Sequence, residues 1–393
     1  MTGAVLTLNS GSSSLKFALF AADSTRTAPE LLGKIEGIGR APAFVAKDAM
    51  GRRLPPGTLA DLAPGITHEA LILRLLPWLD QWLGARAVLA VGHRVVHGGS
   101  RFRQPIRMTD AILTELDTLS PLAPLHQPHN LAAIRAIAAW RAEIPQIACF
   151  DTGFHATQDP LATRFALPRA LHDEGVLRYG FHGLSYEHIA NVLPTHLGEL
   201  AEGRVIAAHL GNGASLCAMR GRKSVATSMG FTALDGLMMG RRCGALDPGV
   251  VLYLMQARGM DADQIERLLY HDSGLFGVSG ISNSVQVLLD SPHPHAREAV
   301  DLYCHKAAGV LAGLIPAIGG LDALVFTAGI GENAAPVRQA ICDRLAWLGV
   351  ALDAQANAAN ATDIGAPQST VRVLVLPANE EAVVADACRA LLA

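Results

Sequence analysis

A glycine-punctuated strand–turn–strand pattern occurs twice in this chain, at residues 5–17 and again at residues 205–216. In each copy an apolar run of β type leads into a turn of Gly, Ser and Asn, and a second apolar segment follows. Such turns leave several backbone N–H groups unpaired, and their small side chains let an anion approach closely. Taken alone, the turns would also suit two ordinary surface hairpins. On duplicated halves they predict a cleft that grips a polyphosphate from both sides, as a phosphotransferase requires.

Length, composition and charge narrow the class of protein. The chain has 393 residues, of which 50% are hydrophobic and 17% are charged. That length favours two domains, and that composition favours a compact soluble protein over a disordered one. The formal net charge is −3 and no basic block is present, so neither nucleic acid nor an anionic membrane is expected as a partner.

The cysteines and the apolar runs bear on the compartment. The six cysteines are scattered and form no C-x-x-C pair, which indicates reduced thiols of a cytoplasmic protein. No basic leader followed by an apolar stretch opens the chain, so no signal peptide is expected. The longest uncharged apolar run, residues 307–321, is too short to span a membrane and contains Pro316. We expect it to form a buried helix that ends at a turn.

Hydrophobic periodicity predicts alternating strands and helices in both halves. Strands are expected at residues 5–8, 15–20, 88–91, 144–150, 323–327 and 371–376, with a strand–turn–strand at 205–216. Helices are expected at residues 68–83, 128–140, 249–258, 262–270 and 296–315, with a last helix after residue 381. Pro77 should kink or shorten the first of these helices. The pattern indicates an α/β architecture, with two similar domains of mixed sheets around a central cleft.

Polar residues follow several of the expected strands. In α/β sheets the carboxyl ends of the strands are where ligands bind, because loops and helix N-termini converge there. We therefore expect a ligand site to include Asn9, Arg94, Asp151 and the segments 209–213 and 329–333.

Six segments together resemble the acetate kinase family. They are NSGSSSLK at 9–16, HRVVHGG at 93–99, FDTGFH at 150–155, YGFHG at 179–183, HLGNG at 209–213 and GIGEN at 329–333. The match runs from Asn9 to Glu381 in the family's order. The family belongs to the superfamily of actin, sugar kinases and heat-shock chaperones, so the resemblance implies duplicated actin-like, ribonuclease H-like domains. It implies a first domain of residues 1–151, completed by about 377–393, and a second of residues 152–376 for nucleotide binding and homodimerisation.

The resemblance implies reversible transfer of the ATP γ-phosphoryl group to acetate, in line and with Mg²⁺, or with Mn²⁺ as an alternative. A carboxylate ionises at roughly pH 4–5, so at neutral pH the nucleophile is already an anion and needs no general base. The difficulty is electrostatic, because one anion must approach another. Positive charge and hydrogen-bond donors must therefore meet the phosphoryl oxygens and the nucleophile.

Catalytic roles follow from the resemblance, residue by residue. Arg94 is expected to bind the substrate carboxylate with its guanidinium fork, and Arg242 to neutralise the phosphoryl group in flight. His182 would steady the transition state by hydrogen bonding, and His126 would lie at the edge of the site or orient its loop. Asp151 matches the residue often described as the acid or base. Since no base is needed, we assign it to placing Mg²⁺, a metal-bound water or an arginine.

Binding roles follow in the same way. Asn9 and Glu380 match the metal positions, where one amide and one carboxylate suffice because Mg²⁺ keeps several waters. The acyl pocket would be formed by Val96, Leu125, Phe181 and Ala233, with Arg94 at its polar end. The nucleotide and its phosphates would be bound by Ser12, Lys16, His209, Leu210, Gly211, Asn212, Gly213, Ser284, Val285, Gln286, Gly329, Ile330, Gly331, Glu332 and Asn333.

The sequence departs from the family pattern at three places. Where the family usually has Asp-x-Arg beside the nucleoside, this chain has Ser284-Val285-Gln286, which leaves the donor preference open. Ala233 replaces a proline of the acyl pocket, so the pocket should be roomier and propionate a second substrate; a methylene discriminates by only about 1–3 kcal/mol. Arg241 stands where a threonine is usual, and it either helps to bind anions or faces solvent.

Other functions stay open on the sequence alone. The chain could be a propionate or butyrate kinase, or a carboxylate kinase that uses another phosphoryl donor such as pyrophosphate. The altered residues 284–286 motivate the alternative of a kinase that uses another phosphoryl donor. An actin-like nucleotide-binding scaffold that hydrolyses ATP slowly is the alternative from another class of protein. A scaffold does not need the paired arginines and His182, and their presence together argues against it.

Overall fold

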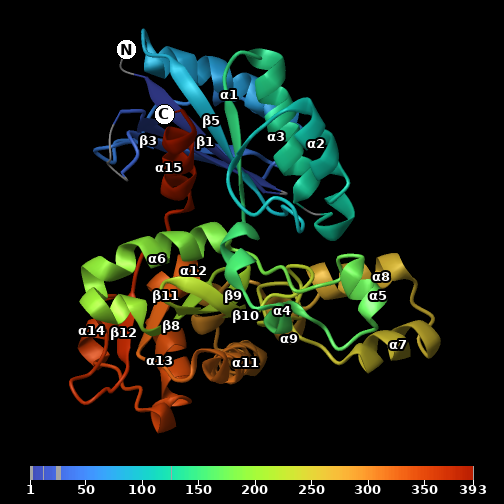
Figure 1. Ribbon diagram of the computed structural model, residues 1–393, viewed down its shortest axis with the longest axis vertical. Coiled ribbons are helices and arrows are strands. Elements are labelled where there is room, and N and C mark those ends of the chain that lie inside the picture. Colours follow the sequence, from blue (N-terminus) through green and yellow to red (C-terminus); the bar gives the residue numbers. More distant parts are fainter. Residues whose placement is uncertain (1–2, 12, 24–27, 125, 393) are drawn as a thin grey trace. The chain divides into compact units, whose positions relative to one another are not determined.

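The computed structural model describes residues 3–392 except 12, 24–27 and 125. The chain divides into two compact units (Figure 1). The first consists of Met1–Phe154 together with Asn379–Ala393, and the second of His155–Ala378. The C-terminal segment thus returns to the unit in which the chain begins.

The first unit is built on a mixed sheet with strand order β4-β3-β2-β1-β5-β7-β6. The first copy of the repeated pattern forms the antiparallel hairpin β1–β2, in which Asn9 lies opposite Lys16. Strand β1 then pairs in parallel with β5, and β5 with β7, so the polar ends of these three strands meet at one edge. The strands are β1 (Ala4–Ser10), β2 (Ser14–Ala21), β3 (Leu31–Glu36), β4 (Ala43–Asp48), β5 (Val88–Val95), β6 (Ile106–Arg107) and β7 (Gln146–Phe150).

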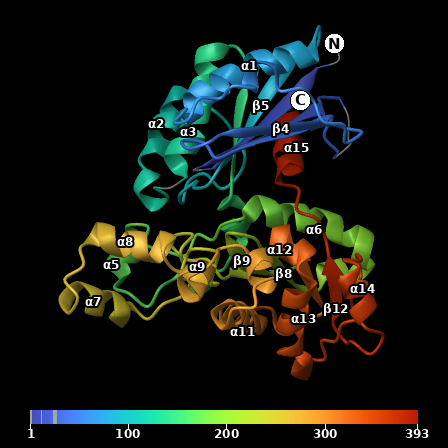
Figure 2. The same ribbon diagram turned by 180° about the vertical axis from the view of Figure 1, so that it is seen from behind.

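Helices cover both faces of this sheet (Figures 1 and 2). Helices α1 (His68–Leu83) and α3 (Gln127–Trp140) pack on one face, over a core in which Leu6, Phe17 and Leu75 are fully buried. Helix α15 (Glu380–Leu392) packs on β1 and β5. It passes so close to Gly92 that a Cβ there would lie 2.4 Å from Val384 Cγ1. The unit also contains α2 (Asp110–Asp117) and the short 3₁₀ helices η1 (Gly57–Leu59) and η2 (Ser120–Leu122).

The expectation that Pro77 kinks or shortens the first helix is wrong as to length, because α1 runs unbroken from His68 to Leu83. The proline removes the N–H that would bond the carbonyl of Leu73, and Leu73 is 45% exposed, so water can reach that carbonyl. The apolar face that α1 buries outweighs the loss. Likewise α11 (Pro294–Ile318) runs past Pro316 and ends at Gly319, whose φ is 75°.

The second unit repeats the plan of the first. Its mixed sheet has the order β10-β9-β8-β11-β12, and β8–β9 is again an antiparallel hairpin followed by two parallel neighbours, β11 and β12. The same arrangement holds for β3-β2-β1-β5-β7 of the first unit. The prediction of duplicated α/β halves with mixed sheets is therefore confirmed. The strands are β8 (Arg204–Leu210), β9 (Ala214–Arg220), β10 (Lys223–Thr227), β11 (Ala323–Thr327) and β12 (Arg372–Val375).

Helix α6 (Gly183–Leu197) lies on one side of the second sheet, and α11 and α13 (Ala335–Asp343) lie on the other (Figure 1). None of the helices in the described part of the chain is long and apolar enough to cross a membrane. The remaining helices of this unit are α4 (Pro160–Thr163), α5 (Arg169–Asp173), α7 (Pro248–Gln256), α8 (Ala262–His271), α9 (Gly274–Ser279), α10 (Val285–Leu289), α12 (Ala328–Asn333) and α14 (Ala354–Ala358), with 3₁₀ helices η3 (Gly153–Thr157, at the unit boundary), η4 (Gly198–Glu202) and η5 (Ala346–Leu348).

Candidate active site

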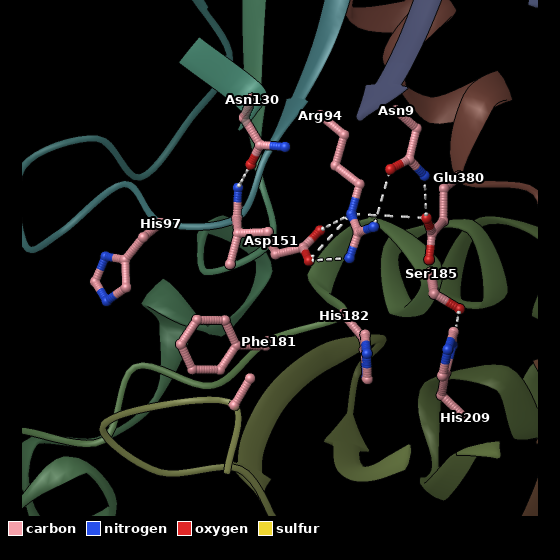
Figure 3. A network of polar contacts seen from close by, with 12 residues as sticks. Asn9, Arg94, His97, Asn130, Asp151, Phe181, His182, Ser185, His209 and Glu380 are labelled. Carbon is pink, nitrogen blue, oxygen red and sulfur yellow. Dashed lines mark hydrogen bonds and ion pairs between the residues drawn. The ribbon is translucent and has the colours of Figure 1, made fainter. Parts of the chain in front are cut away.

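In the first unit, Arg94 is the centre of a polar network at the carboxyl ends of β1, β5 and β7 (Figure 3). Its Nε donates to both carboxylate oxygens of Asp151, at 3.0 and 3.1 Å, and its Nη2 donates to Oδ2 at 2.5 Å. Its Nη1 donates to Asn9 Oδ1 at 3.0 Å. The Asn9 amide in turn donates to Glu380 Oε2 at 3.2 Å, which ties the start of α15 to the network.

The charge of Arg94 is held firmly. Burial disfavours the cation, but the carboxylates of Asp151, Glu380 and Glu381 outweigh it and raise the pKa of Arg94 above its usual value. Asp151 is 1% exposed, so the pair is shielded from water and salt. A guanidinium has five N–H groups, and the bonds above use one on each nitrogen. Each terminal nitrogen therefore keeps one further N–H for a ligand.

Amide side chains of α3 and a histidine of α1 hold the loops around this network. Asn130 accepts from the backbone N–H of Val96 at 2.9 Å and donates to the carbonyl of Ser10 at 2.5 Å. His68 lies 2.6 Å from the carbonyl of Gly11 through its Nε2, which must be the donor because a carbonyl only accepts. The turn after β1 and the segment after β5 are thus fixed by helices packed on the sheet.

In the second unit, His182 lies at the N-cap of α6 with a φ of 59°, in the left-handed region that few non-glycine residues occupy. Its Nδ1 lies 2.8 Å from Ser215 Oγ, and Ser215 Oγ lies 2.5 Å from the Tyr186 hydroxyl. The imidazole stacks on that of His209, with ring centroids 4.1 Å apart. His209 is itself bonded to Ser185 through Nδ1 at 2.8 Å (Figure 3).

Buried His155 fixes the backbone just before His182. Its Nε2 lies 3.0 Å from the carbonyl of Phe181, and its Nδ1 lies 2.9 Å from Ser224 Oγ. Burial lowers its pKa to about 4, so the ring is neutral at pH 7. Because the carbonyl can only accept, the proton is on Nε2 and Ser224 donates to Nδ1.

The turn between β8 and β9 brings its glycine next to two donor side chains. A Cβ at Gly213 would lie 3.4 Å from His182 Nε2 and 3.7 Å from Arg242 Nη1. Arg242 also donates from Nη1 to the carbonyl of Ala233 at 2.9 Å, so the residue that replaces the family's proline contacts the arginine. A backbone turn, an imidazole and a guanidinium therefore converge on one place, which suits an oxyanion.

The structure answers the question about Arg241. Its guanidinium lies over the Phe276 ring, 4.2 Å from the centroid, and its Nη1 donates to the carbonyl of His271 at 2.9 Å. Arg241 therefore holds the loop that carries Arg242 against α8 and α9. The side chain stays partly exposed, which agrees with one of the two roles considered from the sequence, and anion binding stays a prediction.

A cavity of about 350 Å³ lies beside the same turn. Its lining residues carry no charge, and three of its side chains are asparagines. Asn283 donates to Asn212 Oδ1 at 2.9 Å across its rim, and Gln286 donates to Asp290, the C-cap residue of α10, at 2.9 Å. The lining is Gly211, Asn212, Asn283, Ser284, Val285, Gln286, Gly329, Ile330, Asn333 and Ala334.

The other expected site residues are placed as follows. Ser12 and Leu125 lie outside the described residues. Lys16 is exposed on β2, and His126 directly precedes α3. Glu332 does not line the cavity, since its carboxylate accepts from the backbone N–H of Ala378 at 2.9 Å. In the second unit, Phe181 is 1% exposed and packs inside, whereas Val96 lies after β5 in the first unit.

The expectation that the polar residues follow their strands needs correction at three positions. Asn9, Arg94 and His209 lie within β1, β5 and β8, because strand pairing continues to Ser10, Val95 and Leu210. Asp151 does follow β7, as expected.

Several residues of the network were missed from the sequence. They are polar residues on otherwise apolar elements, and Arg338, at 0% exposure, is an example. Its Nη1 donates to the carbonyl of Gly331 at 2.8 Å and so supports the GIGEN segment. Such residues break the apolar pattern of their elements, and that break was the available signal. The set is His68, Asn130, His155, Ser185, Tyr186, Ser215 and Arg338.

Comparison with known proteins decides the family. The model of the acetokinase family matches residues 4–386. The chain belongs to the acetokinase family. A protein named acetate kinase from Rhodopseudomonas palustris is 50% identical over 392 residues, which cover 98% of this chain and 97% of that protein. The resemblance inferred from the six segments is thereby confirmed.

Solved structures agree with this assignment. A propionate kinase from Francisella tularensis has a TM-score of 0.90 at 33% identity, with 98% of each chain covered. An acetate kinase from Porphyromonas gingivalis has a TM-score of 0.86 at 32% identity, with 100% of each chain covered. The two-sheet fold described above is therefore the fold of the family.

The buried histidines predict how stability depends on pH. Burial lowers the pKa values of His93, His97 and His155 to about 4, below the roughly 6.5 of an unfolded chain. Below pH 6.5 each of them takes up a proton on unfolding. The free energy of unfolding therefore has its full value, as far as these histidines are concerned, above pH 6.5. It should fall by up to about 1.4 kcal/mol per histidine for each pH unit down to 4. Urea unfolding at several pH values measures this slope.

In the variant His155→Gln, the free energy of unfolding should change less steeply with pH, by the contribution of one histidine. His295→Gln, at an exposed position, is the matched control and should leave it unchanged. A slope that His155→Gln does not alter would contradict a neutral, buried His155.

Proposed function

We propose that this protein transfers the γ-phosphoryl group of ATP to acetate, reversibly, giving acetyl phosphate and ADP. The observation that carries the proposal is the convergence of Gly213, His182 Nε2 and Arg242 Nη1 beside an uncharged cavity. A phosphoryl group held there meets donors and positive charge, and a nucleoside fits the cavity. Membership of the acetokinase family and relatives named acetate kinase support the same conclusion.

The acceptor would be bound by Arg94. Its two remaining terminal N–H groups can hold a carboxylate while Asp151 keeps the guanidinium charged and oriented. One acetate oxygen then forms a bond to the γ-phosphorus as the bond from that phosphorus to the bridging oxygen of ADP breaks. No proton moves in this step. Asp151 is accordingly a positioning residue for Arg94 and not a base.

Arg242 and His182 would stabilise the transferred group. Arg242 is anchored by the carbonyl of Ala233, and His182 by Ser215, so neither donor has to reorganise during the reaction. The segment 209–213 would hold the phosphates, and the assignment of exposed Lys16 to phosphate binding stays a prediction. The cavity lined by residues 283–286 and 329–334 would take the nucleoside.

A magnesium ion fits the residues around Asn9 and Glu380. No cluster of three or more His, Cys, Asp or Glu side chains suited to a metal is found among the residues that the structure describes. Mg²⁺ is often bound by one or two carboxylates, several waters and substrate phosphates, so it does not need such a cluster. The Glu380 carboxylate and the Asn9 amide oxygen would hold it, and it would neutralise the phosphate oxygens of the nucleotide.

Propionate is proposed as a second acceptor. Ala233 leaves out the ring of a proline in the loop that contacts Arg242, and one of the similar solved structures is named a propionate kinase. Because a methylene is worth only about 1–3 kcal/mol in an apolar pocket, the two acids should differ by less than about 200-fold in kcat/KM.

The test of the proposed function is acyl phosphate formation, trapped with hydroxylamine, from acetate, propionate and butyrate. ATP with Mg²⁺ and pyrophosphate with Mg²⁺ serve as alternative donors. We expect product from acetate and ATP, and ATP turnover that depends on added acetate. Product from pyrophosphate alone would contradict the nucleotide assignment, and acetate-independent ATP hydrolysis would favour a scaffold.

Arg242→Ala should lower kcat by roughly 10³-fold and leave the KM for acetate within about twofold, because its charge acts on the transition state. Arg297→Ala is the control for removal of one positive charge, since the side chain of Arg297 is 88% exposed on α11. Steady-state kinetics of both variants give the comparison. Equal losses in the two variants would contradict a specific role for Arg242.

Glu380→Gln should raise the Mg²⁺ concentration needed for half-maximal rate by roughly tenfold or more, as loss of a metal-site carboxylate does. Glu298→Gln on the exposed face of α11 is the control for removal of one negative charge. Rates are measured over a titration of Mg²⁺ at fixed ATP. An unchanged Mg²⁺ requirement would exclude Glu380 from the metal site.

We also propose that the protein is a homodimer that associates through α7 and works in the cytoplasm. The described helix α7 buries none of its residues within the unit, and Val250, Leu252, Tyr253 and Met255 are 38–54% exposed. An exposed helix with this many apolar side chains is typical of an interface. The free cysteines suit a reducing compartment.

Leu252→Glu should reduce the molar mass in solution from about twice 41.4 kDa to 41.4 kDa, because a charge would be buried in the interface. Light scattering after size-exclusion chromatography measures the mass. Leu161→Glu, at an exposed leucine of α4, should leave the mass unchanged. A wild-type mass of 41.4 kDa would refute the dimer.

A further inference from the structure

We propose that Tyr186 and Ser215 form a hydrogen-bond relay that fixes the ring proton of His182 on Nε2. The relay makes His182 a donor toward the group bound at Gly213. The inference rests on the proposed function for the identity of that group, a phosphoryl oxygen. It assigns positioning roles to two residues that do not touch the substrate.

The relay is short and buried. His182 Nδ1 lies 2.8 Å from Ser215 Oγ, which lies 2.5 Å from the Tyr186 hydroxyl. Tyr186 and Ser215 are both 0% exposed, so water does not compete for these bonds. Tyr186 is one turn along α6 from His182, and its backbone N–H donates to the His182 carbonyl at 3.1 Å. The helix that caps at His182 therefore also supplies the end of the relay.

The direction of the hydrogen bonds in the relay depends on the single proton of Ser215 Oγ, which lies between the Tyr186 hydroxyl and His182 Nδ1. The Tyr186 oxygen is also hydrogen-bonded to the backbone of His209, and this contact lowers the pKa of the phenol against the larger effect of burial, as an N–H donor does. In the proposed relay the phenol proton is directed to Ser215 Oγ, so that the single proton of Ser215 is directed to His182 Nδ1. Nδ1 thus accepts, and a neutral His182 carries its proton on Nε2.

A half-turn of the ring about its Cβ–Cγ bond would put Cδ2 in the place of Nδ1 and break the hydrogen bond to Ser215. The ring stacks on His209 at an interplanar angle of 18°, and His209 is held by Ser185. Nε2 stays on the side of Gly213, 3.4 Å from the position of a Cβ there. The other tautomer would present a lone pair to an anionic oxygen, which is repulsive, whereas Nε2–H donates a hydrogen bond to it.

The tautomer is measured directly by long-range ¹H–¹⁵N NMR of protein labelled at histidine nitrogen, with His182→Asn used to assign the His182 signals. In the wild type we expect Nδ1 unprotonated and Nε2 protonated. In Tyr186→Phe, Ser215 is free to rotate and accept from Nδ1–H, so both tautomers should be populated. A wild-type His182 protonated on Nδ1 alone would overturn the proposal, whatever the enzyme activity.

Kinetics separate this role from a merely structural one. Tyr186→Phe should lower kcat roughly tenfold, less than the ~10²–10³ that loss of a whole transition-state donor costs, with the KM values for ATP and acetate within about twofold. In the His182→Asn background the same substitution should have no further effect. An equal loss in that background would overturn the proposal.

Tyr303→Phe is the matched control. Its hydroxyl is also buried, on α11, and has no hydrogen-bond partner among the described residues. We expect it to change neither the His182 spectrum nor kcat. If the wild type forms no acyl phosphate at all, the proposed function fails while the NMR result still decides the relay. A normal enzyme whose His182 spectrum is the same in Tyr186→Phe refutes the relay alone.

Discussion

The ion pair between Arg94 and Asp151 is the interaction on which the first half of the site depends. A guanidinium buried at the end of a sheet has to be paired, and Asp151 pairs it through two nitrogens while Asn9 takes the third. Since β1, β5 and β7 run parallel, the residues at their ends meet without long loops. The C-terminal helix completes the arrangement through Glu380. The fold thus supplies a fixed positive charge, to which the proposed function assigns the carboxylate of the acceptor.

In the second unit, His182 and Arg242 each contact a neutral group. His182 Nδ1 lies within hydrogen-bonding distance of the Ser215 hydroxyl, and Arg242 donates to the carbonyl of Ala233. Further carboxylates near these donors would repel a phosphoryl group and weaken its binding. The uncharged lining of the neighbouring cavity follows the same logic. Two copies of one topology therefore present different electrostatics, one suited to holding a cation in place and the other to receiving an anion.

The sequence predicts the duplicated topology well, because a glycine-rich turn between two apolar runs is a local signal. It also places Arg94, Asp151 and His182 in motifs that the structure builds into polar networks. It does not reveal His68, Tyr186 or Ser215. Each of them contacts an element that lies elsewhere in the chain, or stands on a helix face that is otherwise apolar. Strand ends are displaced for a related reason: pairing with a neighbour extends β5 to Val95 past a glycine and a histidine that look like a turn. Pro77 shows that packing overrides a local breaker.

The central claim is that Asp151 acts by holding Arg94 and not as a base. A double-mutant cycle with Asp151→Asn and Arg94→Ala, measured as kcat/KM for acetate, tests it most directly. The account predicts that Asp151→Asn alone costs roughly 10–100-fold and that it costs almost nothing further once Arg94 is removed, since its only task is then gone. Losses that multiply in the double variant would contradict the account and give Asp151 a chemical role independent of Arg94.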